Sequence, residues 1–110
     1  YEKTGSFDRA LSLHREILLT DKNNLNSINA CAFIMAMESK NLDRALKLSE
    51  IACAKDKGNG AFFDTLGYIM LKMGRLDKAE AFLKKAEQII PFNKEIKDHL
   101  EELTLVKKKL

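Results

Sequence analysis

Apolar residues recur along this chain at intervals of three and four positions, the spacing of one face of an α-helix. Between these stretches stand short segments rich in Gly, Asn, Asp or Lys, which favour turns. No segment alternates β-branched and polar residues as a half-buried strand does. We therefore expect an all-α fold with helices near residues 7–20, 25–38, 42–56, 60–73, 76–89 and 94–108.

One five-residue motif occurs three times. It reads Phe-Asp-Arg-Ala-Leu at 7–11, Leu-Asp-Arg-Ala-Leu at 42–46 and Leu-Asp-Lys-Ala-Glu at 76–80. Its aspartate recurs after 35 and then 34 residues. A fixed period of this size is typical of stacked supersecondary units. The pattern predicts a repeat of about 34 residues, each unit made of two helices.

The third unit carries the signals that such a helix pair needs. Gly74 lies between its two helices, where a tight turn requires a permissive backbone. Asp77 falls in the first turn of the second helix, and Pro91 ends that helix because it lacks an N–H. We expect small residues where helices cross closely: Ala45, Ala52, Gly67, Ala79 and Ala86.

This third unit, about residues 60–93, resembles a tetratricopeptide repeat (TPR) along its whole length. The family's pattern is W-x2-L-G-x2-Y, then A-x3-F, a small alanine and a late proline. Apolar residues replace the aromatic ones here, and the matching positions are Phe63, Leu66, Gly67, Met70, Ala79, Leu83, Ala86 and Pro91. The resemblance implies a right-handed α-α superhelix of helical hairpins, with first helices on the concave side. The sequence of the repeats is similar to that of bacterial members of the family.

The resemblance divides the chain into a single domain of four parts. They are a partial first repeat (1–24), a second repeat (25–59), the third repeat (60–93) and a capping helix (94–110). Tyr1 and Gly5 fit the end of a first helix and its turn, so we expect the intact protein to continue upstream. Ser49 stands where a large apolar residue is usual, and the turn at 39–41 is one residue longer than its counterpart in the third repeat.

The last helix has one apolar stripe formed by Ile96, Leu100, Leu103, Val106 and Leu110. Its opposite face is polar, which suits the cover that a terminal repeat needs. An amphipathic membrane helix is an alternative, although it would want a more basic polar face. A further alternative is the first helix of another repeat.

Composition and charge narrow the classes of partner. Hydrophobic residues make up 45% and charged residues 32%, as in ordinary soluble proteins. The net charge is 19 − 16 = +3, and the one basic run, 107–109, is interpreted as a solvated end. No apolar run approaches the ~20 residues of a membrane span. We expect no nucleic-acid partner and no membrane insertion, with the cytoplasm favoured and the periplasm left open.

The sequence lacks the patterns that carry chemistry. Cys31 and Cys53 are not spaced like metal ligands and lie far from His14 and His99. They are interpreted as small core residues in a reducing setting, with a disulfide as the alternative. His14 is expected to be structural, and His99 to be exposed or on the concave side. The glycine segment 57–60 is too short for a phosphate loop. We expect no enzyme activity, no cofactor and no metal.

The resemblance also implies where a partner binds, because TPR partners usually lie along the first helices as extended peptides or helices. The positions carried over are Asn26, Asn29, Phe33 and Met37 in the second repeat, Asp64, Tyr68 and Lys72 in the third, and Asp98 and Glu102 in the cap. One subgroup of the family grips a C-terminal carboxylate with Lys, Arg and Asn. Here Ala61 and Thr65 replace the basic residues and Ala30 replaces an asparagine, so we expect no such clamp.

These patterns predict a protein–protein interaction scaffold or adaptor that binds a peptide or protein through its concave face. The identity of the partner is not encoded in the repeats. A self-association module is the alternative from a different class, with the chain otherwise a monomer or weakly associating. A third hypothesis is an accessory domain of a larger enzyme or of a secretion or assembly machine.

Overall fold

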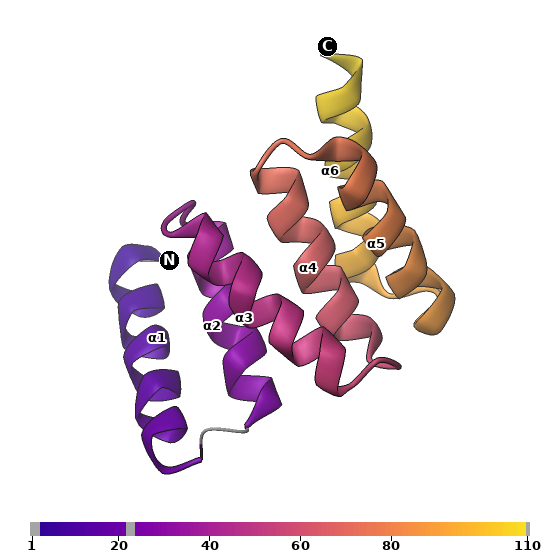
Figure 1. Cartoon of the computed structure of the whole chain (residues 1–110). Helices are drawn as coiled ribbons and strands as arrows, with labels where there is room; N and C mark the ends of the chain where they lie inside the picture. The colour runs from indigo at the N-terminus through magenta and orange to yellow at the C-terminus, as the bar shows by residue number, and fades with distance from the viewer. Residues whose placement is uncertain (1–2, 22–23, 110) are drawn as a thin grey trace.

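A computed structural model describes residues 3–21 and 24–109 of the chain, and the described residues form helices and no strand. The helices are α1 (Lys3–Thr20), α2 (Leu25–Met37), α3 (Leu42–Lys55), α4 (Gly60–Lys72), α5 (Leu76–Ile89) and α6 (Lys94–Lys108). Successive helices lie side by side from the N-terminal end of the stack to its C-terminal end (Figure 1). The predicted all-α repeat architecture is confirmed.

The predicted boundaries of α2 to α6 agree with the structure to within one residue. The prediction for α1 was wrong at its start, because the helix begins at Lys3 and Gly5 lies inside it instead of in a turn. A single glycine costs a helix only about 1 kcal/mol relative to alanine, which the rest of α1 tolerates. Tyr1 lies outside the described residues.

An asparagine opens each of the three helices α2, α4 and α6. The side-chain oxygens of Asn24, Asn59 and Asn93 accept the backbone N–H three residues later, at 3.0, 3.1 and 3.0 Å. Each cap satisfies a donor that the first helical turn leaves unpaired, and such caps are worth about 1 kcal/mol. The asparagines therefore fix where α2, α4 and α6 start. We call these three the inner helices.

The turns within the two complete hairpins differ by one residue, as the sequence predicts. Residues 73–75 join α4 to α5, and residues 38–41 join α2 to α3. Gly74 adopts φ +80°, a left-handed conformation that glycine accepts without steric cost. The longer turn instead uses Ser39 and Asn41, with φ of 54° and 51°.

Small residues lie at the helix crossings. The four alanines of the repeat positions have no exposed surface: Ala45, Ala52, Ala79 and Ala86. A Cβ added to Gly67 would lie 2.7 Å from Cγ of Leu83, so α4 and α5 approach each other closely at this point. The close crossing expected at Gly67 is confirmed, with Leu83 as the side chain that lies against it, and the four alanines are fully buried.

The two ends of the stack are attached differently. Within the described residues, α1 contacts α2 alone, and His14 Nδ1 lies 3.2 Å from the hydroxyl of Ser27. At the other end, α6 packs on both α4 and α5. Lys107 of α6 also pairs with Glu80 of α5, so this member of the basic run is held against the neighbouring helix.

Candidate functional site

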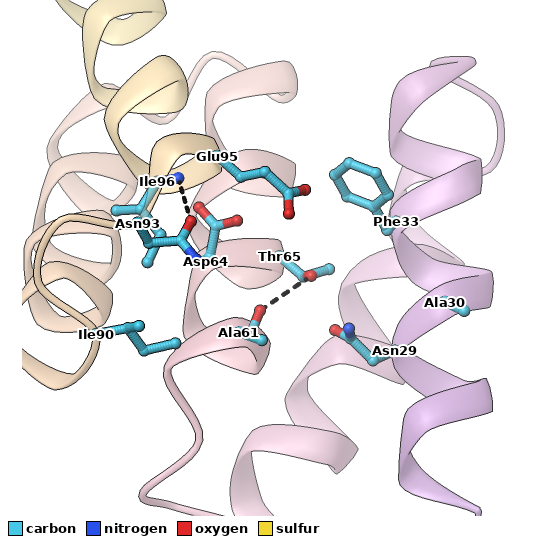
Figure 2. Close-up of a pocket in the computed structure, with 10 residues that line it drawn as sticks. All are labelled: Asn29, Ala30, Phe33, Ala61, Asp64, Thr65, Ile90, Asn93, Glu95 and Ile96. Carbon is cyan, nitrogen blue, oxygen red and sulfur yellow. Dashed lines mark hydrogen bonds between the residues drawn. The ribbon is translucent and has the colours of Figure 1, made fainter.

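The inner helices α2, α4 and α6 border a hollow of about 280 Å³ (Figure 2). Helix α2 contributes three of its lining residues, α4 another three, and the segment from the end of α5 into α6 the rest. They are Asn29, Ala30, Phe33, Ala61, Asp64, Thr65, Ile90, Asn93, Glu95 and Ile96. The hollow thus joins residues from both complete repeats and from the last helix.

A buried hydrogen bond ties α6 to α4 beside this hollow. Nδ1 of His99 lies 2.7 Å from Oδ1 of Asp64, and the two residues are 8% and 7% exposed. The imidazole also stacks on the ring of Tyr68, with 4.4 Å between centroids. Phe33 of α2 lies against both rings, at 5.4 Å from Tyr68 and 6.2 Å from His99. We call Phe33, Asp64, Tyr68 and His99 the His99 cluster.

The cluster corrects one expectation about His99. The exposed position was wrong, because this side chain is buried among residues of three helices. The Asp64 carboxylate belongs to the same network, where it shares a hydrogen bond with the His99 imidazole. Asp64 lines the hollow while it holds α6 against α4, and His99 lies beside the hollow.

A second pair of charges continues the cluster toward the end of α4. The ammonium group of Lys72 lies 5.1 Å from the Tyr68 ring centroid and 3.5 Å from the Glu102 carboxylate. Partial burial lowers the pKa of Lys72, but Tyr68 and Glu102 raise it by more, so the net shift is upward. Asp98 pairs with Lys94 at 3.3 Å on the exposed side of α6.

Two polar groups in the hollow have no partner among the described residues. Oδ1 of Asn29 is buried without a hydrogen bond. The exposed carboxylate of Glu95 makes no ion pair there, and it points from the first turn of α6 toward the ring of Phe33 (Figure 2). The Thr65 hydroxyl, in contrast, donates to the carbonyl of Ala61 at 3.2 Å. The hollow therefore has one exposed carboxylate without an ion pair, that of Glu95, whereas the Asn29 oxygen is buried.

The nine predicted contact residues separate into three groups. Those that line the hollow are Asn29, Phe33 and Asp64. Those that lie beside it in the network around His99 are Tyr68, Lys72 and Glu102. Those that do not line it are Asn26, which is exposed, Met37, which packs against the core, and Asp98, which is paired with Lys94.

Sequence reasoning missed Glu95 and Asn93 as members of the site. It had singled out Ala30, Ala61 and Thr65, but only as places where clamp residues are missing, and all three line the hollow. The signal for Glu95 was its place two residues after an N-cap asparagine at the start of an inner helix. That position brings its side chain to the end of α6 that borders the hollow.

Other kinds of site find no support in the described part of the chain. Across residues 3–21 and 24–109, the side chains of His, Cys, Asp and Glu form no group of three that is suited to a metal ion. No described helix is long and apolar enough to cross a membrane. Cys31 and Cys53 are buried free thiols, and burial raises the pKa of both.

Comparison with known proteins gave matches in structure only. No protein-family model matches the chain, and neither does any curated protein. The first TPR domain of human RPAP3 superposes with a TM-score of 0.80 at 17% identity, over 97% of this chain and 84% of that one. The first TPR of Spaghetti (RPAP3), bound to the HSP90 peptide SRMEEVD, gives 0.79 at 17% identity, over 96% and 83%.

A third similar structure is the type III secretion chaperone SycD of Yersinia enterocolitica, in complex with a peptide of the translocator YopD. Its TM-score is 0.71 at 18% identity, over 94% of this chain and 84% of SycD. The chain therefore has the fold of TPR domains, as its repeats predicted. Identities this low establish the fold alone, and a bacterial origin stays a prediction.

Proposed function

We propose that the chain is a protein-interaction module that binds an extended segment of a protein partner along α2, α4 and α6, and that it catalyses no reaction itself. The observation that carries the proposal is the hollow of about 280 Å³ that α2, α4 and α6 border together, because side chains from three helices line one open space there.

The half-exposed ring of Phe33 supports the same proposal. It lies in the hollow with one side packed on Tyr68, so its orientation is fixed before a partner arrives. Aromatic side chains held in this way give large contact area at low entropic cost. Phe33 and Asn29 are the proposed contacts, while Tyr68, Asp64 and the Lys72–Glu102 pair hold the inner helices in place.

The similar structures support peptide binding by analogy of fold. Spaghetti (RPAP3) is bound to an HSP90 peptide, and SycD is bound to a YopD peptide. The HSP90 peptide, SRMEEVD, carries acidic residues toward its end. The hollow described above has Glu95 and includes no Lys or Arg among its described lining residues. We therefore propose that this module does not select an acidic tail.

Selection from a phage-displayed library of random 12-residue peptides on the full chain tests the proposal. We expect peptides that bind in the hollow. Phe33→Ala should then weaken binding of the selected peptide about 30-fold, because loss of a hot-spot aromatic side chain costs about 2 kcal/mol. The control is Ile51→Ala, an exposed apolar residue of outer helix α3. If the parent chain and Phe33→Ala bind the selected peptide equally well, and circular dichroism shows intact helices, the proposed binding site in the hollow is contradicted.

A further inference from the structure

The carboxylates around the hollow differ in their partners. Asp64 shares a hydrogen bond with His99, Glu102 pairs with Lys72, and Asp98 pairs with Lys94. Within the described chain, Glu95 has no such partner, although it borders the same space. The Glu95 carboxylate therefore remains open at the edge of the site, and the described lining residues supply no Lys or Arg to meet it.

An aromatic ring lies across the hollow from this carboxylate. Figure 2 shows the Glu95 side chain extending from α6 toward the ring of Phe33 on α2, across the hollow. An aromatic face attracts a cation, and a carboxylate does so more strongly. A guanidinium group between the two can stack on the ring and donate two hydrogen bonds to the carboxylate.

The size of the hollow fits a side chain of this kind. Its volume of about 280 Å³ is just below the range of roughly 300–1,000 Å³ for small-molecule sites, so it suits one side chain better than a whole ligand. Asn29 lines the hollow from α2, with its amide directed into the space between α2 and α4 (Figure 2).

We infer that the hollow between Phe33 and Glu95 is a specificity pocket for a basic side chain of the bound segment, arginine before lysine. The inference rests on the proposed peptide-binding function and adds the chemistry of the partner to it. Arginine ranks first because its flat guanidinium stacks on a ring and binds a carboxylate with two hydrogen bonds, whereas lysine acts as a point charge. An acidic segment is disfavoured because Glu95 would repel it.

The test uses the same library, selected separately on the full parent chain and on Glu95→Gln. On the parent chain we expect one position of the selected peptides to be enriched in Arg and Lys. Replacing that residue of a synthetic peptide by Gln should weaken binding roughly fivefold to tenfold, the sum expected of one cation–π contact and one exposed ion pair. On Glu95→Gln the enrichment should disappear.

The matched control is Glu101→Gln, an exposed glutamate on the same helix that does not line the hollow. It should leave both the enrichment and the affinity unchanged. Peptides that depend on Phe33 but show no basic preference overturn this inference and leave the proposed function standing. Peptides that do not depend on Phe33, or no binding peptides at all, overturn both.

Discussion

Single side chains decide how the inner helices are held beside the hollow. His99 reaches from α6 into the space between Asp64, Tyr68 and Phe33, and it is the only hydrogen-bond partner that the described chain gives the Asp64 carboxylate. A buried carboxylate without a partner is strongly destabilising. The Asp64–His99 contact thus connects the last helix to the centre of the stack and lies against the rings of Tyr68 and Phe33.

His99→Ala tests this role. The change leaves Asp64 buried and unpaired, so the free energy of unfolding should fall by about 2–4 kcal/mol in urea denaturation. His14→Ala is a matched control, because that histidine is half-buried and its hydrogen bond within the described residues is to the uncharged Ser27 hydroxyl. Its expected cost is about 1 kcal/mol. Equal losses in the free energy of unfolding for the two variants would show that the Asp64–His99 contact contributes no more than the His14–Ser27 contact.

The buried thiol of Cys53 gives a prediction that depends on pH. Burial raises its pKa from the ordinary 9.0 to about 11. The native thiol should therefore resist a disulfide reagent such as Ellman's reagent at pH 8, whereas both cysteines react in urea. Between pH 9 and 11 the native state binds the proton that the unfolded state releases, so stability should fall as pH rises through that window. Equal rates with and without urea would contradict this account.

At the scale of elements, the structure depends on close helix crossings and on the residues that start and end each helix. The outer helix α5 approaches α4 where Gly67 has no side chain, and the asparagine caps set the start of every inner helix. The Gly67 crossing and the helix boundaries were predicted from the sequence because helical periodicity, Gly74 and Pro91 act locally, whereas the asparagine caps were not predicted. These local signals explain why five of the helices were predicted almost to the residue.

Gly67→Ala tests the crossing. Helix propensity alone would favour alanine by about 1 kcal/mol. The added Cβ would however lie 2.7 and 2.8 Å from the Leu83 side chain and 3.1 Å from its backbone nitrogen. We expect a net loss of about 1–2 kcal/mol from overpacking. Gly58→Ala is the control, since nothing lies within 4 Å of its Cβ position, and it should be neutral or slightly stabilising in thermal denaturation.

The site was less predictable than the helices, for a physical reason. The pairing of Asp64 with His99 joins residues 35 positions apart, and no helical period encodes which side chains meet across two helices. The resemblance named Asn29 and Phe33, which line the hollow, and their contact with a partner stays a prediction. It did not show that Asp64 and Tyr68 are buried, or that Glu95 borders the hollow.

At the scale of the whole molecule, the stack is an elongated body of 42 × 31 × 24 Å whose helices differ in how many neighbours they contact. Helix α4 lies in the middle and contacts α2, α3, α5 and α6. The helix at the N-terminal end, α1, contacts only α2 among the described residues and exposes 57% of Leu13. Repeat arrays gain stability from neighbouring units, so the end with fewer neighbours should open first.

Hydrogen exchange measures this gradient directly. Amides of α1 should exchange fastest among the helices, and those of α4 slowest, because opening free energies follow local burial. The comparison is internal, so both helices are read in the same sample by mass spectrometry of peptic fragments. Equal protection of α1 and α4 would contradict this gradient and indicate that the whole stack opens in one step.

The central claim is that the inner faces of α2, α4 and α6 bind a peptide with a basic side chain between Phe33 and Glu95. Backbone amide chemical shifts of the labelled chain, recorded while a selected Arg-containing peptide is added, test it most directly. The account predicts saturable shifts concentrated at residues 29–33, 61–65 and 93–96. Shifts confined to the outer helices α3 and α5, with these three segments unchanged, would contradict it.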